Sequence, residues 1–155
     1  MEIKLVRYNP RQDKADLEAL IADFQYRLDQ LGEKVDLDKF SKEIDQRSKS
    51  LINRNSIVLA KDGDSLVGAG FFTIWTDFLG NQHCLIHDVV TRKENAFKNG
   101  IEEMILRELF NYLKKTMKID KIGLWALKRD SNFQSVLMKL KIKKNTELDY
   151  YEHYL

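Results

Sequence analysis

Two side chains that can exchange protons near neutral pH, His87 and Asp88, are adjacent in the apolar segment 84–91. Histidine, with an ordinary pKa of about 6.5, accepts a proton at neutral pH. Asp88 needs a raised pKa to do so, or acts through a water molecule or by holding a cationic amine. Because successive strand side chains point to opposite faces, only one of the two can face a substrate. The pair predicts general-base chemistry; the competing interpretation is a hydrogen-bonded sheet histidine beside a structural carboxylate.

A second candidate site follows directly, where a polar loop leads into a helical pattern that begins near Gly100. Backbone N–H groups at a helix N-terminus bind anions, and the helix dipole adds to the attraction. The loop is therefore a candidate site for a phosphate-bearing ligand.

The potential metal ligands in this region are spaced unfavourably. His83 and His87 share one face of the predicted strand, and Cys84 and Asp88 share the other. Residues four apart on a strand are separated by ~13 Å, whereas the ligands of one zinc ion all lie about 2 Å from it. We expect no metal site.

The elements that hold these groups are indicated by hydrophobic periodicity and turn residues. Strands are predicted at 2–8, 56–61, 66–75, 84–91 and 121–127, with short closing strands near Ile142 and over 147–154. Helices are predicted from Asp13 or Asp16 to Gly32, from Asp36 through Leu51, over 100–117 and over 131–140. This order predicts an α/β or α+β fold: a mixed, mostly antiparallel sheet of about six or seven strands, with about four helices on its two faces.

Length and composition limit the class of protein. The chain has 155 residues, of which 43% are apolar and 32% charged, and this predicts a single domain over 1–155. No apolar run approaches the roughly 20 residues that span a bilayer, and we expect no membrane partner. The N-terminus lacks a signal-type apolar stretch. The lone Cys84 excludes an internal disulfide, and we expect a cytoplasmic protein.

Positive charge is concentrated in one segment. The segment from Lys114 to Lys144 contains ten basic residues and two acidic ones, which gives it a net charge of +8. Such a run is usually a solvated surface. The alternative is a surface for a nucleotide phosphate or a nucleic acid. No nucleic-acid-binding module or interleaved aromatic motif accompanies it, so nucleic-acid binding is the least favoured function.

The order of elements resembles the GCN5-related N-acetyltransferase (GNAT) superfamily over nearly the whole chain. The Val67-Gly68 pair in LVGAGFFTIW is similar to the opening of that family's third strand. IHDVVT resembles the fourth strand, where polyamine and amino-sugar acetyltransferases often carry a Glu-Asp pair. RDSN, a short helix and LKIKK resemble the closing helix and its ending.

The resemblance implies an acetyl-CoA-dependent N-acetyltransferase acting on a primary amine of a small molecule or protein. It implies that acetyl-CoA, the co-substrate, binds where the fourth and fifth strands splay apart. Backbone groups at the end of the fourth strand would hold the pantetheine arm, and the N–H groups of the following loop would hold the pyrophosphate. The family also has an asparagine at the start of its last helix, and this chain has an asparagine at the matching position. The cofactor-binding residues implied in this way are Val89, Val90, Thr91, Phe97, Lys98, Asn99, Gly100, Ile101 and Asn132.

The resemblance also implies catalytic roles. The base candidates are His87 and Asp88. Family members often use a tyrosine of the last helix as the acid, but the matching position here is Met138, or Lys139 with a one-residue shift. Neither side chain suits that role. Tyr150, on the expected closing strand, is therefore the candidate acid.

The loop departs from the family signature V-x-x-x-x-R/Q-x-x-G-x-G/A. With a one-residue insertion the signature recovers Gly100, but Phe97 takes the Arg/Gln position and Glu102 the second Gly position. A carboxylate in the first helical turn suits the dipole but repels a pyrophosphate, for which Lys93 and Lys98 partly compensate. These departures favour the alternative function: a non-catalytic GNAT-like domain that serves as a binding or interaction module, including a homodimer through its closing strands.

Overall fold

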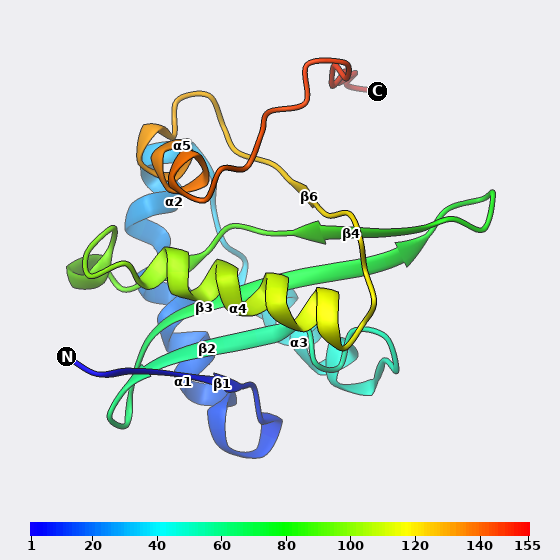
Figure 1. The fold of residues 1–155 in the computed structure, drawn as a ribbon. Coiled ribbons are helices and arrows are strands. Elements are labelled where there is room, and N and C mark those ends of the chain that lie inside the picture. Colours follow the sequence, from blue (N-terminus) through cyan, green and yellow to red (C-terminus); the bar gives the residue numbers. More distant parts are fainter.

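The computed structural model describes residues 1–155 and has one six-stranded sheet at its centre (Figure 1). The strands are β1 (Ile3–Arg7), β2 (Ile57–Asp62), β3 (Ser65–Thr76), β4 (Gln82–Ile86), β5 (Val90–Thr91) and β6 (Gly123–Leu124). The helices are α1 (Pro10–Asp23), α2 (Gln25–Leu31), α3 (Leu37–Lys49), α4 (Ile101–Lys115) and α5 (Ser131–Lys139), with a 3-10 helix η1 (Lys93–Asn95). The predicted mixed, mostly antiparallel sheet is confirmed, since only β4 and β6 pair in parallel.

The sheet runs in the order β1-β2-β3-β4-β6, and β5 pairs with β3 alone. The predicted continuous strand 84–91 is wrong, because its two halves, β4 and β5, are separated by residues 87–89. Ile86 pairs with Phe72, and Val90 pairs with Ala69. The four-residue step from Ile86 to Val90 therefore lies opposite a three-residue step on β3. The extra residue is a β-bulge, which bends a strand and re-aims its side chains.

Helices cover both faces of the sheet, as predicted. Figure 1 shows α4 across one face, with α1 and α3 behind the other. The α4 side buries Phe72, Ile86 and Leu109, and the α1–α3 side buries Leu17, Ile44 and Leu59. These two apolar layers fix the sheet between the helices.

Glycine on β3 allows the close approach of α4. A Cβ atom at Gly70 would lie 2.3 Å from Cγ2 of Ile105, which no real packing tolerates. The start of α4 therefore packs closely against β3, the strand that pairs with both β4 and β5.

The N-terminal helices differ from prediction in their ends. Asn9, not Asp13 or Asp16, caps α1 by accepting a hydrogen bond from Arg11 N–H, and Pro10 follows at the first helical position. The predicted helix divides at Phe24 into α1 and α2, which is why five helices are present instead of about four.

The next helix begins as predicted and ends early. Asp36 caps α3, as expected, but the helix ends at Lys49. Leu51, expected on its apolar face, lies outside it and is 84% exposed.

The C-terminal part has less sheet than predicted. β6 covers Gly123–Leu124 instead of 121–127, and no strand follows α5. The expected closing strands are therefore wrong: aromatic residues such as Tyr150 and Tyr151 favour strands, but a strand requires a hydrogen-bonded neighbour, and these side chains are exposed. None of the helices combines the length and the apolar content that a membrane-spanning segment needs.

Candidate functional site

The loop before α4 leaves several backbone donors free. Gly100 begins the helix with a φ of +68° and no side-chain cap. The N–H groups of Asn99, Gly100, Ile101 and Glu103 donate no hydrogen bond within the chain. Uncapped donors at the positive end of a fifteen-residue helix are groups of the kind that bind anions.

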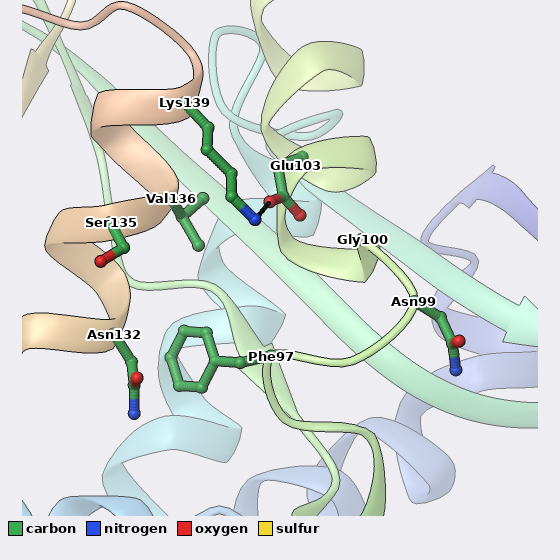
Figure 2. A pocket seen from close by; sticks show the side chains of 8 residues that line it. All are labelled: Phe97, Asn99, Gly100, Glu103, Asn132, Ser135, Val136 and Lys139. Carbon is green, nitrogen blue, oxygen red and sulfur yellow. Dashed lines mark ion pairs between the residues drawn. The ribbon is translucent and has the colours of Figure 1, made fainter.

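A pocket of about 340 Å³ adjoins this loop, between the start of α4 and one face of α5 (Figure 2). Its lining residues are Phe97, Asn99, Gly100, Glu103, Asn132, Ser135, Val136 and Lys139. Across the pocket, Lys139 Nζ lies 3.7 Å from a carboxylate oxygen of Glu103. The pocket therefore combines free amides, neutral polar side chains and one balanced charge pair, a set of groups that fits a phosphate-bearing ligand.

Helix α5 supplies half of this pocket through a regular spacing. Asn132, Ser135, Val136 and Lys139 follow the pattern i, i+3, i+4, i+7 and lie on one helical face. Asp130 caps the helix by accepting a hydrogen bond of 3.2 Å from Phe133 N–H.

A buried arginine connects the loop to α5. Arg27, on α2, forms an ion pair with Asp130, and both side chains are buried. Its guanidinium carbon also lies 4.7 Å from the centre of the Phe97 ring. Phe97 has a φ of +56°, a strained value for a bulky residue, so Arg27 helps to hold an otherwise unfavourable loop shape.

Glu102 faces the inside of the same loop. Its side chain is buried, and one carboxylate oxygen accepts a hydrogen bond of 2.5 Å from Phe97 N–H. Burial raises the pKa of Glu102, and the Phe97 hydrogen bond opposes part of that shift.

The β-bulge lies where the sheet opens. Pairing between β4 and β6 ends at Ile86 and Leu124, and β5 pairs only with β3. The N–H groups of Asp88 and Val89 donate no hydrogen bond within the chain. An extended ligand can pair with such free strand groups as an added strand does.

Asp88 is poised to exchange protons near neutral pH. It is half-buried, and burial raises its pKa to about 6, with further increases from the negative charges of Asp130 and Glu33; Arg27 opposes them. A carboxylate with this pKa is mostly ionised at pH 7 and accepts a proton readily.

The side chain of His87 is held by contacts within the fold. Its Nε2 lies 2.7 Å from the Thr73 hydroxyl, on the side where Arg47 of α3 contacts the sheet. Burial lowers the pKa of His87, and the Arg47 charge lowers it further while Glu43 opposes. His87 and Asp88 therefore have different neighbours, one beneath α3 and the other near α2 and the start of α5.

Tyr150 lies apart from the pocket lining. It is 74% exposed, and its ring centre is 5.7 Å from that of Trp125, the residue after β6. The negative charge of Glu152 raises the pKa of Tyr150.

The residues predicted for cofactor binding fall into three groups. Phe97, Asn99, Gly100 and Asn132 meet at the pocket. Val89, Val90, Thr91 and Ile101 are buried, so only their backbone groups are candidates for contact with a ligand; Lys98 is exposed and does not line the pocket.

Sequence reasoning missed Arg27, Asp130, Ser135, Val136 and Glu103 as site residues, and it weighed Lys139 only as a proton donor. The helical spacing from Asn132 to Lys139 carried a usable signal for three of these residues. Arg27 had none, because it is distant in sequence and reaches the loop only through the packing of α2. The structure also assembles no group of three or more potential metal ligands.

Comparisons with known proteins identify the fold. No family model matches the sequence, and no curated protein matches it either. A solved structure of a possible acetyltransferase from Clostridium difficile 630 has a TM-score of 0.76 at 16% identity, covering 100% of this chain and 99% of that one. A GNAT family acetyltransferase from Staphylococcus aureus subsp. aureus USA300_TCH1516 has a TM-score of 0.68 at 14% identity, covering 100% of both chains.

A third similar structure is a chain of the NatC complex bound to Gag peptide and CoA. Its TM-score is 0.69 at 16% identity, covering 90% of this chain and 84% of that one. The chain therefore has the fold of the GNAT acetyltransferases, and the predicted resemblance is confirmed at that level. At these identities the likeness is one of fold.

Proposed function

We propose that this protein is an acetyl-CoA-dependent N-acetyltransferase that acts on a primary amine of a small molecule or a protein. The observation that carries the proposal is the pocket beside the uncapped start of α4, which is lined by Asn99 and Gly100, with their free amides, and by Asn132, Ser135 and Lys139 of α5. When bound, acetyl-CoA supplies the activated acetyl group.

The loop and α5 support binding of the cofactor's phosphates. The free N–H groups of Asn99, Gly100 and Ile101 would donate to phosphate oxygens, and the ammonium of Lys139, which is paired with Glu103 in the free protein, would contact the same oxygens. The free N–H groups of Asp88 and Val89 would hold an extended arm along the opened edge. One structure of similar fold was solved with CoA and a peptide, which agrees with this assignment.

Asp88 is the side chain best suited to be the base. It lies at the bulge where β4 and β6 diverge, and its pKa is raised to about 6. An incoming ammonium would gain from the adjacent negative charge and would lose its proton to Asp88 or to a water held by it. His87 is the weaker candidate, since its Nε2 is engaged with Thr73.

Tyr150 remains the proposed proton donor to the leaving thiolate. Its support is its contact with Trp125, which directly follows the strand that diverges from β4. The negative charge of Glu152 raises the pKa of Tyr150, which makes it a weaker acid than an ordinary tyrosine.

The proposal is tested by binding and by transfer. Titration calorimetry with acetyl-CoA should give saturable heat for the wild type. Ser135→Trp, which fills the pocket from an exposed helix position, should abolish it. Met138→Trp, exposed on the same helix outside the pocket lining, is the matched control and should bind normally. Absence of wild-type binding at millimolar acetyl-CoA would contradict the proposal.

Acetyl transfer is then measured against a panel of polyamines, amino sugars and peptides with free N-termini, by thiol release. A second candidate function, a non-catalytic binding module, is favoured by one observation: Phe97 N–H is already engaged by Glu102. Binding of acetyl-CoA without release of thiol from any amine would support that function instead.

A further inference from the structure

One donor of the loop is already occupied by the chain itself. Phe97 N–H donates to Glu102 at 2.5 Å, while the next free amides of the loop and helix remain open. Glu102 is 2% exposed, so this hydrogen bond is shielded from water. A ligand that approaches the pocket therefore finds the Phe97 amide turned inward.

The carboxylate of Glu102 is incompletely satisfied. Its second oxygen, Oε2, is buried and has no hydrogen-bond partner. The nearby cation, Arg27, is engaged with Asp130 and stacks on the Phe97 ring. A buried carboxylate with an unpartnered oxygen is costly and requires an explanation.

The position of Glu102 supplies that explanation. It is the second residue of α4, where the helix dipole and unpaired amides favour a negative charge. From there it reaches back to the residue whose φ of +56° shapes the loop. One carboxylate thus performs both functions of a bound anion at a helix start: it takes a loop amide and neutralises the dipole.

We infer that Glu102 is a positioning residue of the cofactor loop, acting as its resident anion: it holds Phe97 N–H inward and reduces the affinity of the adjoining pocket for phosphate-bearing ligands. This inference rests on the proposed function for the identity of the ligand. The first half of the inference, that Glu102 holds the Phe97 amide inward, does not depend on any ligand.

The hold on Phe97 is tested on the free protein by amide hydrogen exchange, measured by NMR. Glu102→Gly should raise the exchange rate of the Phe97 amide by about tenfold. Glu102→Gln should keep it slow, because the side-chain carbonyl still accepts the hydrogen bond. Glu94→Gln, which removes an exposed charge of the same loop, is the control. Equal Phe97 exchange in wild type and Glu102→Gly would overturn the inference.

The effect on affinity is tested by calorimetry with acetyl-CoA and, separately, with inorganic pyrophosphate. Glu102→Gln and Glu102→Gly should both bind acetyl-CoA about tenfold more tightly than wild type, since each removes the buried charge. Glu94→Gln should bind like wild type. Unchanged or weaker binding by both Glu102 variants would overturn the inference.

Failure of the proposed function and failure of the inference about Glu102 would give different results. If no variant binds acetyl-CoA, the proposed function is contradicted, whereas faster Phe97 exchange in Glu102→Gly still supports the positioning role. If wild type binds acetyl-CoA but the Glu102 variants bind no better, the proposed function stands and the inference fails. Circular dichroism of each variant checks that it is folded.

Discussion

The guanidinium of Arg27 forms a buried ion pair with the carboxylate of Asp130, joining α2 to the N-cap residue of α5 across 103 positions of sequence. The same guanidinium stacks on Phe97 of the loop before α4. One side chain therefore connects three elements that together shape the candidate site.

Removing Arg27 should be strongly destabilising. Arg27→Met leaves Asp130 buried without its partner, and the free energy of unfolding should fall by about 3 to 5 kcal/mol. Urea denaturation followed by circular dichroism measures this.

The double variant Arg27→Met with Asp130→Asn separates charge from packing. Asparagine still caps α5 and carries no charge, so most of the lost stability should return. The exposed Arg11→Ala is the control, with a change below about 0.5 kcal/mol. Equal losses in the single and double variants would show that the ion pair is not the cause.

Asp88 should destabilise the fold above its folded pKa. Its folded pKa of about 6 lies above the ordinary value, so the folded state binds more protons between about pH 4 and 6. The penalty is absent below about pH 4 and complete above pH 6. Asp88→Asn should therefore raise the unfolding free energy at pH 7 by about 1 to 3 kcal/mol.

The same substitution should lower acetyl transfer by about 100-fold or more, because the proposed base is lost. Denaturation at pH 4 and 7 and the pH–rate profile measure the two effects, with the exposed Asp64→Asn as control. A wild-type profile with no inflection near pH 6 would argue against Asp88 as the base.

His87 should act in the opposite direction. Its pKa is lowered by burial, so the unfolded state binds more protons below about pH 6.5, and stability is lost as the pH falls through that range. His87→Gln should remove this loss, giving a shallower decline of unfolding free energy from pH 7 to 5. The exposed His153→Gln should leave the wild-type slope. An unchanged slope in His87→Gln would contradict the lowered pKa.

Gly70→Ala should force α4 away from β3. The added Cβ would lie 2.3 Å from Ile105 Cγ2, and overpacking of this kind costs about 1 to 3 kcal/mol. Gly123→Ala on β6 is the matched control, since its nearest neighbour would be 3.7 Å away. Thermal unfolding compares them; equal melting temperatures would refute the close approach.

Tyr150→Phe tests the proposed acid. The turnover number should fall by about 100-fold, with little change in acetyl-CoA affinity, because only the hydroxyl is removed. Tyr151→Phe, exposed on the same segment, is the control. Equal effects of the two substitutions would assign the loss to the segment and not to the Tyr150 hydroxyl.

The sequence predicted much of the sheet because period-two alternation and turn residues are local signals. β1, β2 and β3 lie close to their expected positions, and Asp36 and Gly32 act as the predicted helix ends. The start of α4 at Gly100 was also predictable, since loop and amphipathic helix are adjacent in the chain.

The bulge at His87–Asp88 was not predictable from alternation. It arises because β4 and β5 pair with separate parts of β3, a choice made by registers between distant residues. The absent closing strands have a similar cause: a strand depends on a neighbour, and propensity alone does not supply one.

By itself, then, the sequence determined the order of elements, the loop that opens onto a helix start, and the types of side chain near it. Tertiary structure alone decided that Arg27 stacks on Phe97, that α5 completes the pocket, and that Glu102 turns inward to hold a loop amide. The physical reason is burial: it raises the pKa of Asp88 and of Glu102 and makes unpaired groups costly, and which residues are buried together follows from packing between distant segments.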